Sequence, residues 1–121
     1  MTGRIVLIED DPDTVALVTE MLRELGQDIA AAHEHLGDGD GDGEANLVIT
    51  DLVSVQVFDV AAARRWVAHV RALFPKAAIV VSTAHAPAAR AGAEALGADA
   101  VLSKPFDVAL FTETVDRLLG A

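Results

Sequence analysis

Short, continuously apolar runs alternate with amphipathic patterns along the chain, and this alternation constrains the fold more than any other feature. The apolar runs are rich in β-branched residues and lie at 5–8, 29–32, 47–50, 79–83 and 100–102. Polar and apolar residues do not alternate within them, which is typical of strands covered on both faces. We therefore expect short strands in a sheet that has no exposed face.

Between these runs, apolar residues recur at three- and four-residue spacings, which is the pattern of an amphipathic helix. The helical patterns cover residues 11–25, 59–74, 87–96 and 108–119. Gly26 and Gly97 stand just beyond two of them, where helices commonly end. Strands that alternate with helices predict right-handed βαβ units, and therefore an α/β fold with a parallel sheet and helices on both faces.

Residues 33–46 interrupt this regularity. A second helix belongs here, but residues 37–43 read GDGDGDG, which makes a poor helix. We expect this helix to be short or disordered. Residues 38–43 also match the opening of an EF-hand calcium loop, but its twelfth position is Ile49, inside a predicted strand. A flexible acidic loop is therefore the preferred interpretation over a calcium site.

Length and composition indicate a single domain spanning residues 1–121. No apolar run approaches the roughly 18 residues that a membrane span needs, and the acidic start after position 8 does not fit a signal peptide. Cysteine is absent, which excludes disulfides and thiolate chemistry. The net charge of −10 argues against direct nucleic-acid binding and suits a divalent cation or a basic partner surface. We expect a cytoplasmic protein without membrane or nucleic-acid contacts.

Polar residues follow the predicted strands at the point where each strand ends. The first strand is followed by Glu9 and Asp10, the third by Asp51, and the fourth and fifth end near Thr83 and Lys104. The carboxyl ends of parallel strands meet at one edge of a sheet, where ligands bind. Carboxylates gathered in this way repel one another unless a cation intervenes.

This set of residues predicts a phosphoryl-transfer site. Glu9, Asp10 and Asp51 form a cluster of hard oxygen ligands suited to Mg²⁺. Asp51 is placed to attack phosphorus as an aspartyl nucleophile. The metal, Lys104 and a hydroxyl group would stabilise the phosphoryl oxygens by position and charge.

Over essentially its whole length the chain resembles the receiver domains of two-component response regulators. The matching stretches are IVLIEDDP at 5–12, LVITD at 47–51, VVSTA at 80–84 and GADAVLSKPF at 97–106. The resemblance implies a doubly wound, flavodoxin-like sheet with strand order 2-1-3-4-5. It also implies a signalling module that is not an enzyme. Its partners would be a histidine kinase or phosphotransfer protein and a downstream protein or effector domain bound through residues 87–119.

The resemblance assigns a role to each matching position. Asp51 would be the phospho-acceptor, and Asp10 a direct Mg²⁺ ligand with Glu9 acting through water. The backbone carbonyl of Val53 would supply a further metal ligand. Thr83 would bond to the phosphoryl oxygen, and Lys104 would pair with the phosphoryl group next to a cis Lys104–Pro105 bond.

Two departures from the family pattern leave the signalling output open. The family shows Met-Pro and then Asp-Gly after the acceptor, whereas residues 52–59 read LVSVQVFD. The family's switch aromatic on the fifth strand is replaced by Val101. The first hypothesis is a phosphorylatable receiver, since every position of the chemical set is filled. The alternative is a pseudo-receiver, a protein-interaction module that signals without phosphorylation.

Overall fold

The computed structural model describes residues 4–33, 44–52 and 59–120. The strands are β1 (Ile5–Ile8), β2 (Ile29–His33), β3 (Leu47–Thr50), β4 (Ala78–Thr83) and β5 (Ala100–Ser103). The helices are α1 (Pro12–Glu24), α2 (Val60–Leu73), α3 (Ala86–Leu96) and α4 (Val108–Leu118). The strands and helices that the sequence pattern places within the described residues are all present, with ends that differ by a residue or two.

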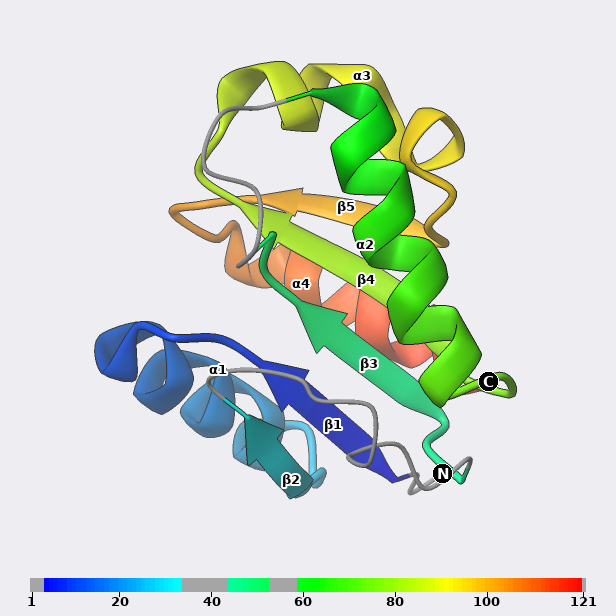
Figure 1. The fold of residues 1–121 in the computed structure, drawn as a ribbon. Coiled ribbons are helices and arrows are strands. Elements are labelled where there is room, and N and C mark those ends of the chain that lie inside the picture. Colours follow the sequence, from blue (N-terminus) through cyan, green and yellow to red (C-terminus); the bar gives the residue numbers. More distant parts are fainter. Residues whose placement is uncertain (1–3, 34–43, 53–58, 121) are drawn as a thin grey trace.

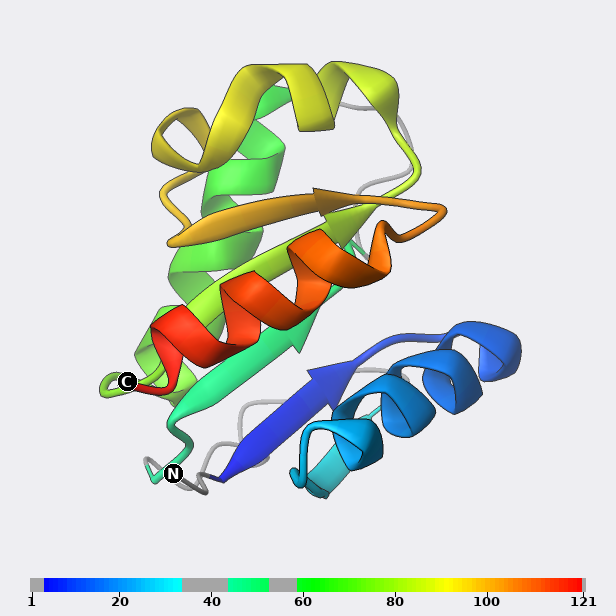
Figure 2. The ribbon, with the colours of Figure 1, turned by 180° about the vertical axis from the view of Figure 1, so that it is seen from behind.

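All strand pairs are parallel, and the sheet order is β2-β1-β3-β4-β5. Helices α2 and α3 cover one face of the sheet (Figure 1), and α1 and α4 cover the other (Figure 2). This arrangement confirms the predicted α/β fold and the order 2-1-3-4-5. The expectation for the second helix falls on residues 34–43, which lie outside the described residues.

Alternate residues of the central strands enter two separate cores, as the period of two of a β-strand requires. Val48 and Ile79 face α2 and α3, where Trp66 is also buried. Leu47 and Ile49 face α1 and α4. Every residue of β1 and β3 is buried, which explains why these segments read as unbroken apolar runs.

Aspartates mark the starts of three helices. Asp11, Asp59 and Asp107 each accept a backbone N–H of the first turn. Asp11 also accepts a hydrogen bond of 2.7 Å from the Thr14 hydroxyl, and this bond lowers the pKa of the Asp11 carboxyl. Asp11 therefore caps α1.

Helix α3 differs from its sequence pattern, which predicted an unbroken helix. Gly92 has φ of 84° and ψ of 168°, so it interrupts α3. A side chain is strongly disfavoured in this region, whereas glycine adopts it readily. Gly97 ends the same helix in the left-handed conformation, as predicted from its position. None of the helices in the described part of the chain is long and apolar enough to cross a membrane.

Candidate functional site

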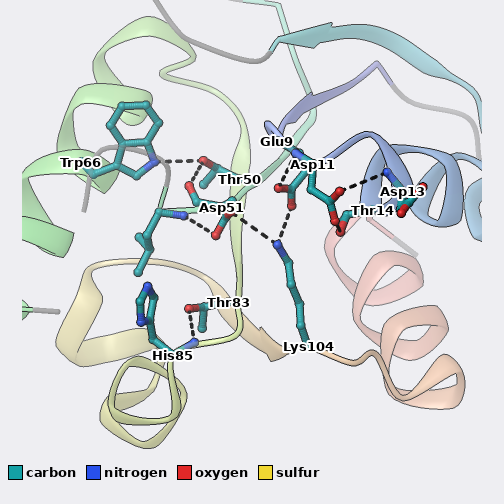
Figure 3. Close-up of polar contacts among 11 residues, drawn as sticks. Glu9, Asp11, Asp13, Thr14, Thr50, Asp51, Trp66, Thr83, His85 and Lys104 are labelled. Carbon is teal, nitrogen blue, oxygen red and sulfur yellow. Dashed lines mark hydrogen bonds and ion pairs between the residues drawn. The ribbon is translucent and has the colours of Figure 1, made fainter. Parts of the chain in front are cut away.

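The carboxyl edge of the sheet gathers polar side chains from four strands (Figure 3). Glu9 follows β1, Asp51 follows β3, Thr83 is the last residue of β4, and Lys104 follows β5. The sheet hydrogen bonds continue through these positions. The Asp51 N–H donates to the Ile8 carbonyl at 2.9 Å, and the Lys104 N–H donates to the Thr83 carbonyl at 2.8 Å. These sheet hydrogen bonds therefore fix the backbone positions of Asp51 and Lys104 relative to the neighbouring strands.

Glu9, Asp10 and Asp51 form an acidic cluster at this edge. Each contributes a carboxylate oxygen, and these oxygens lie within 4.8 Å of one another. Glu9 is buried, Asp51 is half-buried and Asp10 is exposed. The cluster therefore runs from the base of the sheet edge to its surface, and a ligand can approach it from the Asp10 side.

Lys104 supplies the positive charge that this acidic cluster needs. Its Nζ lies 2.6 Å from Oε1 of Glu9 and 3.4 Å from Oδ2 of Asp51. The Lys104 side chain is 17% exposed and that of Glu9 is 1% exposed, so water screens their attraction only weakly. Lys104 thus joins the first and third strands to the fifth by charge.

The pKa of the Glu9 carboxyl is raised above its ordinary value of 4.5, chiefly because burial disfavours the ionised form. The hydrogen bond from Lys104 acts in the opposite direction, and the nearby charge of Asp51 raises this pKa further. Burial and repulsion by Asp51 together raise the Glu9 pKa more than Lys104 lowers it. Additional positive charge at this edge would therefore stabilise the ionised form of Glu9.

The two carboxylate oxygens of Asp51 have different surroundings. Oδ1 accepts the backbone N–H of Leu52 at 2.7 Å, whereas Oδ2 faces Lys104. The bond to Leu52 fixes the rotation of the carboxylate. Asp51 is half-buried, which leaves part of its carboxylate open to an incoming group.

Thr83 and His85 line a neighbouring hollow of about 280 Å³, which also reaches Ser103 and Lys104. The Thr83 hydroxyl accepts the His85 backbone N–H at 3.0 Å, and the Thr83 side chain is buried. The His85 residue itself is exposed. This hollow brings a hydroxyl group and the lysine together beside the acidic cluster.

The donor set fits Mg²⁺. Three carboxylates and one ammonium leave a formal charge of −2 when all are ionised, which matches a divalent cation. Mg²⁺ takes few carboxylates and keeps several waters, and the exposed Asp10 side leaves room for them. Glu9, Asp10 and Asp51 are the side chains that would hold it. Val53, whose carbonyl was predicted as a further ligand, lies outside the described residues.

Comparison with known proteins gives a clear result only at the level of structure. No protein-family model matches the sequence. No curated protein matches it either. A response regulator from Thermotoga maritima superposes with a TM-score of 0.73 over 100% of both chains, at 18% identity. The chain has the receiver-domain fold.

Two further receiver domains are similar to the chain over 100% of both chains compared. The receiver domain of a sensor histidine kinase from Pseudomonas aeruginosa, with a magnesium ion coordinated in its active-site cleft, has a TM-score of 0.69 and 24% identity. The BeF₃-activated receiver domain of DrrB has a TM-score of 0.68 and 21% identity. These similarities extend to the whole receiver fold and not to part of it.

Val101 occupies the place on β5 where the receiver resemblance implies a switch aromatic. Its side chain is partly buried and packs against the core between the sheet and helices α2 and α3. A valine has no ring to rotate between a buried and an exposed position. The cis Lys104–Pro105 peptide that the resemblance implies is present.

The sequence did not indicate a role at the site for Trp66 and Thr50. The Trp66 Nε1–H donates to the Thr50 Oγ1 at 2.9 Å, directly before Asp51 (Figure 3). Trp66 lies on the apolar stripe of α2, a position that indicates burial alone, and it is buried. A polar residue at the end of an apolar strand, one position before Asp51, was the signal that could have drawn attention to Thr50.

Proposed function

We propose that the chain is a phosphorylatable receiver, which accepts a phosphoryl group on Asp51 in a Mg²⁺-dependent reaction. The observation that carries this proposal is the site's composition: Glu9, Asp10 and Asp51 within 4.8 Å, with the Lys104 Nζ 3.4 Å from Asp51. These residues provide a nucleophile, ligands for a cation, and a positive charge for the phosphoryl oxygens. The fold alone would support only a shared architecture.

In the proposed reaction the Asp51 carboxylate attacks phosphorus and forms an acyl phosphate. With a phosphohistidine donor the P–N bond breaks, and the imidazole leaves with the electron pair. The Lys104 ammonium partly neutralises the charge on the phosphoryl oxygens, and the Thr83 hydroxyl is the candidate donor from the neighbouring strand. Mg²⁺, when bound, supplies the remaining positive charge. The chain is then a phosphorelay signalling component of the cytoplasm, whose donor is a histidine kinase or phosphotransfer protein.

The output surface in this proposal comprises α3, β5 and α4, within residues 87–119. Val108 and Leu110 in the first turn of α4 are 56% and 47% exposed, so this surface offers apolar side chains to a partner. A downstream protein or effector domain would bind here. Direct nucleic-acid and membrane contacts form no part of the proposal, because the net charge is −10.

The experiment is phosphorylation of the purified chain with acetyl phosphate and Mg²⁺, read by intact mass. We expect a single adduct of one phosphoryl group in the wild type and none in Asp51→Asn, an isosteric change that removes the nucleophile. Asp99→Asn is the matched control, because Asp99 lies away from the site and pairs with Arg71. An adduct that persists in Asp51→Asn would refute the assignment of the acceptor.

Val101 gives a reason to keep the second candidate, a pseudo-receiver that signals without phosphorylation. With its side chain packed in the core, β5 lacks the movable ring of the family switch. Under this hypothesis neither acetyl phosphate nor beryllofluoride with Mg²⁺ alters the mass or the NMR spectrum. The partner surface on α3, β5 and α4 then binds its target constitutively.

A further inference from the structure

The peptide unit between Asp51 and Leu52 is held at both of its polar ends. Its carbonyl oxygen accepts the Thr50 hydroxyl at 2.7 Å. Its N–H donates to Oδ1 of the Asp51 side chain at 2.7 Å. A peptide unit is planar and rotates as one body. Any group that fixes the carbonyl therefore also fixes the direction of the N–H, and with it the carboxylate.

The Thr50 hydroxyl is itself fixed by the indole of Trp66. The Trp66 Nε1–H donates to Oγ1 of Thr50 at 2.9 Å, which leaves the hydroxyl hydrogen free to point at the Asp51 carbonyl. Thr50 is fully buried and Trp66 is 8% exposed, so water does not compete for these bonds. Figure 3 shows the resulting series, which runs from helix α2 through Thr50 to the carboxylate of Asp51.

These three hydrogen bonds run in one direction, from donor to acceptor, as far as the carboxylate. Bonds arranged in this way polarise one another and are stronger together than separately. The last bond holds Oδ1, and Oδ2 is left facing Lys104. The series thus selects one rotation of the carboxylate out of those that a half-buried aspartate can adopt.

We propose that Trp66 and Thr50 are positioning residues for the phospho-acceptor, acting through the Asp51–Leu52 peptide. The proposal rests on the proposed function and adds to it a buried support that reaches the acceptor from helix α2. Neither residue touches the phosphoryl group. Reaction rates depend steeply on the alignment of a nucleophile, so a support that only orients Asp51 changes the rate of phosphorylation.

Four single variants separate positioning from general packing. Thr50→Val keeps the shape of the side chain and removes its hydroxyl, whereas Thr50→Ser keeps the hydroxyl and removes the methyl group. Trp66→Phe keeps a buried ring and removes the N–H. The matched control is Thr114→Val, because Thr114 is also buried and also donates its hydroxyl to a backbone carbonyl, that of Leu110 on α4, away from the site.

Two quantities are measured in the full chain. The first is the rate constant of phosphorylation by acetyl phosphate at saturating Mg²⁺. We expect Thr50→Val to lower it by about five- to tenfold and Trp66→Phe by about threefold, since these are the factors that one hydrogen bond contributes. Thr50→Ser and Thr114→Val should stay within about twofold of the wild type. The double variant Thr50→Val/Trp66→Phe should be no slower than Thr50→Val, because the two groups act in series.

The second quantity is the amide proton shift of Leu52 by NMR, measured without any phosphoryl donor. A short bond to a carboxylate moves this resonance downfield, and Thr50→Val and Trp66→Phe should move it back while Thr114→Val does not. If the wild type forms no adduct but Leu52 responds as expected, the proposed function fails, whereas the control of the Asp51–Leu52 peptide by Thr50 and Trp66 is supported. If the Leu52 amide shift is unchanged in Thr50→Val, the positioning by Thr50 is refuted whether or not the wild type is phosphorylated. A rate loss equal in Thr50→Ser and Thr50→Val would also overturn it.

Discussion

Replacing Lys104 by methionine tests the electrostatics of the site directly. The substitution keeps the length of the side chain and removes an ammonium that lies 2.6 Å from Glu9 and 3.4 Å from Asp51. Asp51 is half-buried and can recover solvation, but Glu9 is 1% exposed and cannot. We therefore expect the metal-free variant to be less stable than the wild type, with the loss concentrated on Glu9.

The size of this loss depends on whether Glu9 stays ionised or takes up a proton in the variant. Breaking a buried ion pair by removing one partner costs about 3–5 kcal/mol when the remaining charge stays ionised. Glu9 can instead take up a proton. At pH 7 that costs about 3.4 kcal/mol for a carboxyl with an unfolded pKa of 4.5, at about 1.36 kcal/mol per pH unit. Protonation limits the loss, and we expect about 2–3 kcal/mol at pH 7.

The pH dependence follows from the direction of the Glu9 pKa. Because this pKa is raised in the folded state, the folded protein holds a proton more tightly than the unfolded chain, and stability falls as pH rises from 4.5 through the folded pKa. Removing Lys104 raises the folded pKa further. The destabilisation should therefore shrink as pH is lowered from 7 toward 5, by up to about 1.36 kcal/mol per pH unit.

Urea unfolding at pH 5, 6 and 7 in the presence of a chelator measures this loss. Arg71→Met is the control, since the Arg71–Asp99 pair has 43% and 40% exposed side chains and should contribute less than about 1 kcal/mol at every pH. The double variant Glu9→Gln/Lys104→Met should recover most of the stability at pH 7. A loss in Lys104→Met that is below about 1 kcal/mol at pH 7 and constant down to pH 5 would refute the reasoning.

Three further outcomes are expected. Mg²⁺ at ten times its dissociation constant should raise the free energy of unfolding of the wild type by about 1.4 kcal/mol in thermal or urea melts, and Asp10→Asn should abolish most of this gain. The fluorescence of Trp66, the single tryptophan, should change when beryllofluoride and Mg²⁺ are added, because its indole is hydrogen-bonded to Thr50, which directly precedes Asp51; an equal change in Asp51→Asn would contradict this. Asp59→Ala should lower the free energy of unfolding by about 1 kcal/mol without altering the phosphorylation rate, because it removes only the N-cap of α2.

The fold and the members of the site could be predicted because each depends on chain order. The unbroken apolar runs LVIT and IVLI are buried on both faces, so their periodicity reports a sheet covered by helices. Once the strands are parallel, the residues that follow them must share an edge. This is how Glu9, Asp51 and Lys104 were placed together across as many as 95 residues of sequence.

The directions of side chains could not be predicted in the same way. Chain order places Lys104 near both carboxylates but does not say that its shorter contact is with Glu9, since this follows from their relative burial. Likewise the stripe of α2 indicates that Trp66 is buried but not which polar atom its N–H meets. The interruption of α3 at Gly92 was also missed, because a single glycine is tolerated within a helical pattern.

Val101 leaves the proposed chemistry of the site unaffected but removes the aromatic switch that the receiver resemblance implies. The proposed acceptor chemistry depends on residues at strand ends, whereas the switch that the receiver resemblance implies depends on an aromatic side chain on β5, and here that side chain is a packed valine. If Asp51 is phosphorylated as proposed, the signal would have to pass through groups that touch the site. Lys104 is followed by Pro105 and Phe106, and the ring centroid of Phe106 lies 5.7 Å from that of Phe111 on α4. A phosphoryl group on Asp51 would draw the Lys104 ammonium away from Glu9, and the loop that carries Lys104 joins β5 to α4, so α4 is where a change should first be sought.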